Sequence, residues 1–146
     1  MIWQLVVGSI LILISIVIHA SAMAYAVRTI QRHRAWLHRR PHFPRLVAAL
    51  GGVSIWLLTS MTCSVWIWAI YFLLTGALKD LETSVYFSLV SFTTLGFGDI
   101  VLDKGHRLLS GMLAANGLIL FGLTTAFLIE FLQRLHQAQA DSLMER

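Results

Sequence analysis

Three long stretches without a charged side chain constrain this chain more than any other feature. No Asp, Glu, Lys or Arg occurs in residues 1–27, 46–78 or 108–129. Each stretch exceeds the roughly 20 apolar residues that an α-helix needs to cross about 30 Å of hydrocarbon. Only 12% of all residues are charged, whereas about a quarter are charged in a typical soluble domain. The sequence therefore predicts an all-α membrane protein with three transmembrane helices.

The first span, residues 1–27, lacks the positively charged start and the small-residue cleavage site of a signal peptide, and it is too long for one. We therefore expect it to be retained as a helix. Trp3 and Tyr25 lie near its two ends, where aromatic side chains anchor helices at the membrane interface.

The basic residues predict the orientation of the chain. Segment 28–45 holds six arginines and no acid, and the tail 134–146 adds two arginines, against three basic residues in segment 76–107. By the positive-inside rule, the 28–45 loop and the tail lie in the cytoplasm, and the N-terminus and segment 76–107 lie outside. Pro41 and Pro44 are expected to break any helix through the loop. The loop also suits anionic lipid headgroups, at about 1 kcal/mol per basic residue near the surface, although a role in orientation alone is the simpler interpretation. The charge gives no reason to expect nucleic acid as a partner.

A fourth uncharged stretch, residues 83–98, is too short to span a membrane and contains two glycines near its end. Stretches of this length are typical of re-entrant segments. Asp80 suits an N-cap and Glu82 suits the first turn of a helix. A helix over residues 81–92 would reach about 18 Å, halfway into the bilayer. The chain then has residues 93–99 in which to return, which requires an extended backbone.

This return segment has the pattern needed to bind a dehydrated cation. Backbone carbonyls form a cage of oxygens when successive ones point the same way, which requires positive φ at alternate residues. Gly96 and Gly98 are spaced for this and adopt positive φ at little cost. The Thr94 hydroxyl can add an oxygen, while Leu95 and Phe97 are expected to point away from the axis and wedge against the short helix. One chain supplies one column of oxygens, so a ring requires an oligomer, for which fourfold symmetry is the natural solution.

The stretch from Glu82 to Leu132 resembles the pore domain of potassium channels. Their filter signature, Thr-Val-Gly-Tyr-Gly followed by Asp, reads here Thr94-Leu95-Gly96-Phe97-Gly98-Asp99. Phe97 lacks the hydroxyl that braces the filter in many family members. The third span is similar to that of bacterial two-helix channels through the pattern Arg107-Leu108 … Gly117 … Phe121-Gly122-Leu123 … Thr125-Ala126.

The resemblance implies a homotetrameric channel that passes K⁺ passively across the plasma (inner) membrane of a bacterium, without a cofactor. K⁺ is expected to bind the backbone carbonyls of Thr94, Leu95, Gly96 and Phe97 and the Thr94 hydroxyl, with Gly98 completing the filter and with Thr93 and Asp99 supporting it. The predicted organisation is an N-terminal transmembrane helix at 1–27, a basic loop at 28–45, a pore domain at 46–135 (outer helix 46–75, pore helix 81–92, filter 93–99, inner helix 106–133) and a cytoplasmic tail at 134–146.

Several other residues have two interpretations each. By resemblance Gly117 lies at a gating hinge, whereas close helix packing is the alternative. Asn116 and Thr124 either line a water-filled cavity or hydrogen-bond across helices. His19, inside the first span, is expected to be a neutral histidine bonded to a neighbouring helix, although an intramembrane ionisable group also suggests a function. Glu130 is expected to pair with Arg134 one turn later.

Three other functions are consistent with parts of the pattern. A non-selective cation channel would need a disrupted filter, which Gly96 and Gly98 argue against. A transporter subunit would carry several pore repeats in one chain, and a membrane anchor or assembly protein would not need the filter. The first span lacks the spaced arginines of a voltage sensor. An enzyme is unsupported, because no nucleophile and base pair is apparent, and the single Cys63 excludes an intrachain disulfide and a paired-cysteine metal site.

Overall fold

The computed structural model describes residues 1–32 and 42–144. These residues form four helices and no strand: α1 (Ile2–Arg32), α3 (His42–Leu74), α4 (Leu81–Phe92) and α5 (Arg107–Met144). Three of them contain stretches long and apolar enough to cross a membrane, namely Ile2–Arg32, Val47–Leu74 and Arg107–Gln133. The prediction of an all-α membrane protein with three transmembrane helices is therefore confirmed.

The helices extend beyond the predicted spans. α1 continues to Arg32, α3 begins at His42 and α5 reaches Met144, so parts of the predicted loop and tail are helical. Charges limit how much of a helix lies in hydrocarbon, but arginine and glutamine favour helix, and the hydrogen-bonded backbone continues past the membrane boundary. Pro44 lies in the first turn of α3, where its missing N–H breaks no helical hydrogen bond. Pro41 lies outside the described residues.

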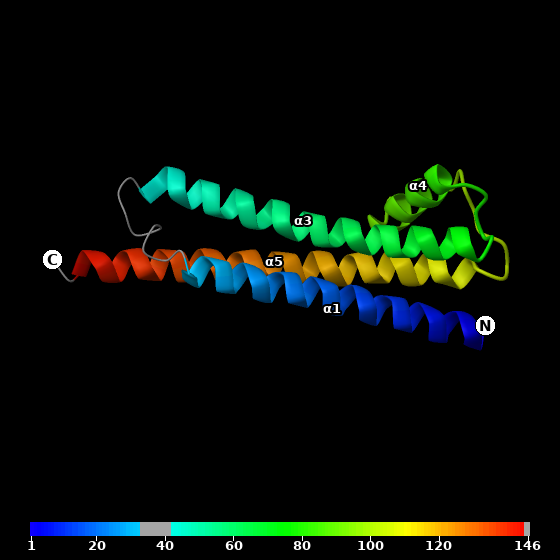
Figure 1. Cartoon of the computed structure of the whole chain (residues 1–146), viewed down its shortest axis with the longest axis horizontal. Helices are drawn as coiled ribbons and strands as arrows, with labels where there is room; N and C mark the ends of the chain where they lie inside the picture. The colour runs from blue at the N-terminus through cyan, green and yellow to red at the C-terminus, as the bar shows by residue number, and fades with distance from the viewer. Residues whose placement is uncertain (33–41, 145–146) are drawn as a thin grey trace.

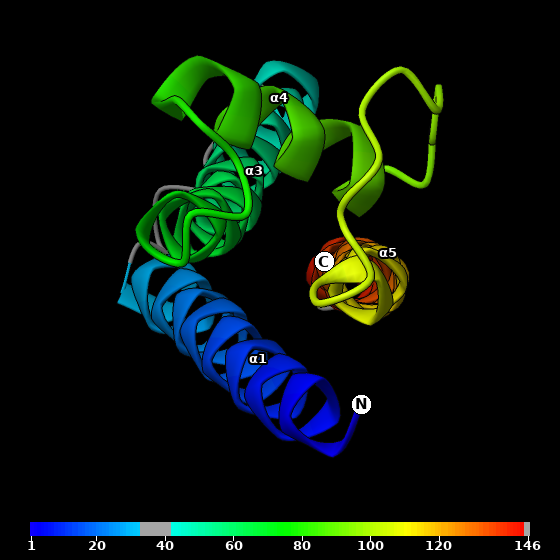
Figure 2. The same ribbon diagram turned by 90° about the vertical axis from the view of Figure 1, so that its right-hand side faces the viewer.

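The long helices run alongside one another, and the short α4 lies at one end of them (Figure 1). The N-terminus lies at this same end, whereas the C-terminus lies at the opposite end. Seen from the end that carries α4, this helix crosses from α3 towards α5, and α1 lies on the other side of that pair (Figure 2). α1 packs against both α3 and α5 but not against α4. The first span is thus part of the bundle and leaves α4 accessible on the far side.

α1 packs through a single stripe of buried residues. They recur every three or four positions, which places them on one face of a helix, and most are small or polar: Gln4, Gly8, Leu11, Ser15, His19, Ala22 and Ala26. Small residues allow helix backbones to approach closely in a membrane, where the hydrophobic effect does not drive association. A methyl group added to Gly8 would collide with the side chain of Met112 on α5. The sequence of α1 therefore favours close packing on α5.

An aromatic and aliphatic core fixes α4 against the long helices. Phe87 of α4 meets Phe72 of α3 edge to face, with ring centroids 5.5 Å apart, a favourable geometry for aromatic pairs. Phe92, at the end of α4, is buried in the same cluster as Leu109 and Leu113 of α5. Contacts at the middle and at the last residue of α4 thus set where the chain leaves this helix and enters residues 93–99.

Candidate functional site

The short helix α4 begins at a side-chain cap. Asp80 accepts a hydrogen bond from the backbone N–H of Thr83 at 2.8 Å and another from the Thr83 hydroxyl at 2.7 Å. These hydrogen bonds, led by the one from the Thr83 backbone, lower the pKa of Asp80 below its usual value. The observed helix, Leu81–Phe92, has the predicted bounds, and the predicted N-cap is confirmed.

The chain turns sharply where α4 ends. The Leu89 carbonyl accepts from the Thr93 N–H at 3.0 Å. The carbonyl of Val90, in the last turn of α4, accepts hydrogen bonds from the Leu95 N–H at 3.0 Å and from the Gly96 N–H at 3.3 Å. These bonds use the last carbonyls of the helix and direct the chain back towards the end from which α4 started. Residues 95–97 then have no regular secondary structure, as a return segment requires.

The backbone of residues 93–99 alternates in conformation. Gly96 and Gly98 have φ of 54° and 79°, so their predicted positive φ is confirmed, and Thr94 extends the alternation inward with φ of 60°. Positive φ is a genuine outlier for a β-branched residue such as Thr94 and is typical of functional segments. No carbonyl oxygen from Thr93 to Gly98 accepts a hydrogen bond from the described part of the chain. The carbonyl oxygens of this segment are therefore unpaired within the described part of the chain.

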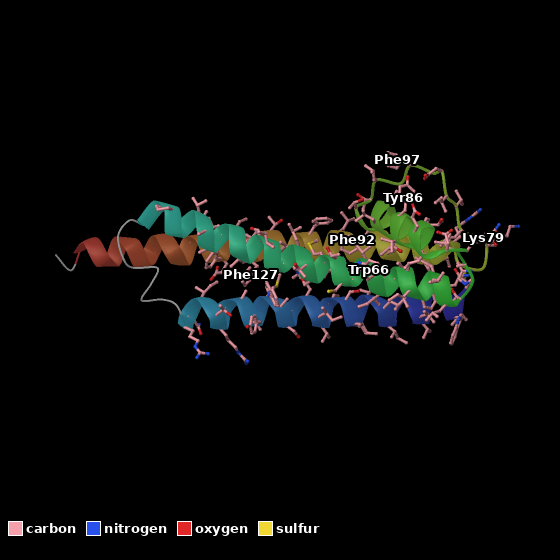
Figure 3. All side chains as sticks on the ribbon, turned by 45° about the horizontal axis from the view of Figure 1, so that its top comes forward. Trp66, Lys79, Tyr86, Phe92, Phe97 and Phe127 are labelled. Atoms are coloured by element: carbon pink, nitrogen blue, oxygen red, sulfur yellow. The ribbon has the colours of Figure 1, made fainter. Side chains whose placement is uncertain are left out.

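The side chains of this segment are mostly uncovered by their own chain. Leu95 is 58% exposed and Phe97 is 66% exposed, and Figure 3 shows Phe97 at the edge of the molecule. Within the single chain α4 packs against α3 and α5, and the packing of Leu95 and Phe97 against a short helix stays a prediction. Non-helical backbone at membrane depth must be buried in protein or line a water-filled path. Leu95 and Phe97 are therefore open to contacts from outside their own chain.

A hydrogen bond ties the far end of the segment to α4. The Tyr86 hydroxyl donates to Oδ2 of Asp99 at 2.7 Å, and Tyr86 lies close to Phe97 in the view of Figure 3. Accepting this bond, the Asp99 carboxylate raises the pKa of Tyr86. Asp99 was predicted to support the segment, but Tyr86 was not identified from the sequence. The only available signal was a phenol between Val85 and Phe87 in the short helix.

α5 approaches the end of α4 closely at Gly117. A methyl group at this position would collide with the backbone carbonyl of Phe92, the last residue of α4. The ring of Phe92 also meets that of Phe121, one turn after Gly117, with centroids 5.8 Å apart. Close packing of α5 against α4 therefore accounts for a glycine at position 117. α5 is a continuous helix through Gly117, and the role of Gly117 as a hinge stays a prediction.

The two polar residues predicted for a cavity both face into the subunit. Asn116 is fully buried within the chain and makes no side-chain hydrogen bond to the described residues. Because it is already covered inside one subunit, it does not line a cavity between subunits, and that interpretation is wrong for Asn116.

Thr124 hydrogen-bonds His19 of α1 at 2.9 Å, which is the interhelical alternative. The predicted bond from His19 to neighbouring helices is confirmed, and its second partner, Ser60 of α3, was missed. The pairing of Glu130 with Arg134 lies outside the described side chains.

Among the described residues, no group of three or more His, Cys, Asp or Glu side chains lies close enough to hold a metal ion. A family model described as "Ion channel" matches residues 52–134 of the 146, from α3 through α4 and the return segment into α5. Neither the curated proteins nor the solved structures include a match to the chain. α1 lies outside the matched region.

Proposed function

This chain belongs to the potassium-channel pore-domain family of ion channels, and from that premise we propose that it is a K⁺-selective channel whose filter is residues 93–99. The observation that supports this proposal most directly is the positive φ at Thr94, Gly96 and Gly98. It aligns successive carbonyls, which replace the water of a dehydrated ion. The ligands are the carbonyls of Thr94, Leu95, Gly96 and Phe97 together with the Thr94 hydroxyl. Gly98 completes the alternation, and Thr93 and Asp99 support it.

A homotetramer is the proposed assembly. Each chain contributes one carbonyl column, and a ring around an ion needs several columns. The exposed Leu95 and Phe97 supply apolar surface that subunit contacts would bury. The lipid bilayer cannot replace those contacts, because the unpaired backbone of the same segment would then face hydrocarbon. K⁺ is the permeant ion here, and the mechanism needs no cofactor.

The proposed orientation places the filter and the N-terminus outside a bacterial inner membrane and the C-terminus in the cytoplasm. Arg28 and Arg32 are exposed near the end of α1, at the end of the bundle opposite α4 (Figure 1). Tyr25 and Trp56 stack nearby with ring centroids 5.3 Å apart, as aromatic residues do at an interface. The basic residues of the 28–45 loop are also proposed to attract anionic lipid headgroups.

Flux measurements test the proposal directly. Purified protein in liposomes is expected to pass K⁺ much faster than Na⁺, with Ba²⁺ blocking the K⁺ flux. Equal Na⁺ and K⁺ flux would favour the non-selective channel instead. No flux under any ionic condition would favour an anchor or assembly protein.

A glycine substitution tests the assigned carbonyl geometry. Gly96→Ala is expected to abolish K⁺ flux while the oligomer still assembles, because an alanine strains the positive φ that the carbonyl column needs. Gly105→Ala is the matched control, since Gly105 lies in the loop after the filter, has no positive φ and has open space for a methyl group. Normal conduction by Gly96→Ala would contradict the role given to the backbone, and loss of conduction by both variants would show an unspecific effect.

A further inference from the structure

His19 connects three helices near the middle of the bundle. Its Nδ1 lies 2.6 Å from Oγ of Ser60 on α3, and its Nε2 lies 2.9 Å from Oγ1 of Thr124 on α5. The imidazole is fully buried. It is thus the one described side chain of α1 that hydrogen-bonds side chains of both α3 and α5.

Each hydroxyl in this set also has a carbonyl partner on its own helix. Ser60 lies 2.8 Å from the Leu57 carbonyl, and Thr124 lies 2.8 Å from the Leu120 carbonyl. A neutral imidazole has one donor nitrogen and one acceptor nitrogen. One hydroxyl therefore accepts from the ring and keeps its carbonyl bond, while the other turns to donate to the ring. All ring nitrogens are satisfied only while α1, α3 and α5 stay together.

The bond to Thr124 holds the inner half of α5. Thr124 lies seven residues beyond Gly117, about 10 Å further along the helix. Beyond it, Phe127 and Phe131 of α5 pack with Met23 of α1 and with Val53 and Leu57 of α3. An apolar contact of this kind tolerates sliding, whereas a buried hydrogen bond is directional and leaves a costly unpaired group when it breaks.

We propose that His19 is a positioning residue that fastens the inner half of α5 to α1 and α3, and thereby sets the balance between the open and closed pore. Displacing this half of α5 from α1 breaks the bond to Thr124 and leaves a buried ring nitrogen without a partner. The first transmembrane helix, which lies outside the matched pore family, then acts as a restraint on the pore-lining helix. The effect on the pore rests on the proposed channel function, whereas the fastening itself does not.

A double-mutant cycle tests the proposal. Thr124→Val removes the bond between Thr124 and His19, and His19→Leu removes this bond together with the one to Ser60. Each variant is expected to change the open–closed equilibrium constant by about tenfold or more in planar bilayers, since one buried hydrogen bond is worth about a factor of ten. The double variant should resemble His19→Leu, because the bond to Thr124 is already lost there. His19→Gln, which keeps a donor and an acceptor, is expected to restore part of the change.

Matched controls separate this contact from general disturbance. Ser21→Ala and Thr59→Val change exposed residues of α1 and α3 whose hydroxyls bond only a carbonyl of their own helix, at Val17 and Ile55. Both are expected to gate like the wild type. Wild-type gating of His19→Leu, or strictly additive effects in the cycle, would overturn the proposal.

Amide hydrogen exchange gives a readout that does not depend on conduction. Exchange over residues 118–133 is expected to rise about tenfold in His19→Leu and in Thr124→Val, without a further rise in the double variant. Unchanged exchange in both variants would refute the fastening. A wild-type protein that passes no ion would refute the channel proposal, and the exchange measurement would still decide the role of His19.

Discussion

Asp99 and Phe97 are the residues on which the bracing of the proposed filter depends. Phe97 has no hydroxyl, and the Tyr86 hydroxyl donates a hydrogen bond to Asp99, which is the brace that we propose. Tyr86→Phe removes only the donor oxygen. K⁺ flux through this variant is expected to start normally and then decline severalfold, because the outer end of the filter is less restrained. Tyr71→Phe is the control, since that ring packs against Phe72 and makes no hydrogen bond to the described residues. Sustained flux through Tyr86→Phe would show that the bond is dispensable.

The same bond predicts a dependence on alkaline pH. Its acceptor, Asp99, raises the pKa of Tyr86 above its ordinary value of 10.0. The contribution of a group with a raised pKa is complete below the ordinary value and is lost as the pH rises through the raised one. Sustained flux in the wild type is therefore expected to hold to about pH 10 and to fall above it towards that of Tyr86→Phe. If the sustained K⁺ flux of Tyr86→Phe and of the wild type falls in parallel as the pH rises, the fall does not come from the titration of Tyr86.

Gly117 offers a steric test at a single residue. Gly117→Ala places a methyl group against the Phe92 carbonyl, so α5 must move away from the base of the filter. Overpacking of this kind costs about 1–3 kcal/mol, and a lower unfolding temperature in mild detergent is expected together with reduced K⁺ flux. Gly111→Ala, on the same helix but with open space around it, should change neither. Equal stability of the two variants would argue against the close-packing role.

Residue roles were predictable where the cause is local. The spacing of Gly96 and Gly98 predicts their positive φ, and the position of Asp80 just before a helix predicts that it is the N-cap. Tyr86 and Asp99 are 13 residues apart, and His19 and Ser60 are 41 apart. Such pairs depend on how the helices rotate against one another, and the spacing of one helix does not determine this. Asn116 and Thr124 each kept two interpretations for that reason, because either side of α5 was an acceptable site for a polar residue.

At the scale of elements, α4 depends on its first turn. The hydrogen bonds from Thr83 lower the pKa of Asp80, so the cap contributes stability above the ordinary pKa of the carboxyl and loses it as the pH falls through the lowered value. Asp80→Ala is expected to fray α4 at every pH and to reduce K⁺ flux. Asp80→Asn keeps a capping oxygen, so it should conduct like the wild type while losing this acid dependence. Identical flux in Asp80→Ala and wild type would show that tertiary contacts alone hold α4.

The bounds of α4 were predictable because a cap and a return segment delimit it in the sequence. The ends of the long helices were not. Loss of apolar residues marks where hydrocarbon ends, whereas the described helical backbone reaches Arg32 in α1 and Met144 in α5, inside the predicted loop and tail.

At the scale of the molecule, α1 is joined to the pore domain along its length. Near its start, Gln4 donates to the Lys104 carbonyl and accepts from the Leu108 N–H, each at 3.3 Å. Further along, the Trp56 indole donates to the Ala22 carbonyl at 3.0 Å. These bonds, with His19 between them, make the first span a structural part of the subunit. Its hydrophobicity predicted a transmembrane helix but not its neighbours, because any apolar face of the pore domain was an equally good partner.

This packing links the direction of α1 to the side on which the filter opens. α1 begins at the end of the bundle that carries α4 and finishes at the opposite end (Figure 1), so labelling one end of α1 reports on the whole subunit. Arg32 ends α1, and Lys79 precedes α4. In a Cys63→Ser background, an impermeant thiol reagent added to intact cells is expected to label Lys79→Cys. Labelling of Arg32→Cys should require permeabilised cells, because the arginine-rich loop that follows it favours the cytoplasm. Labelling of Arg32→Cys alone in intact cells would invert the proposed orientation, and equal labelling of both positions would contradict a single orientation of the chain.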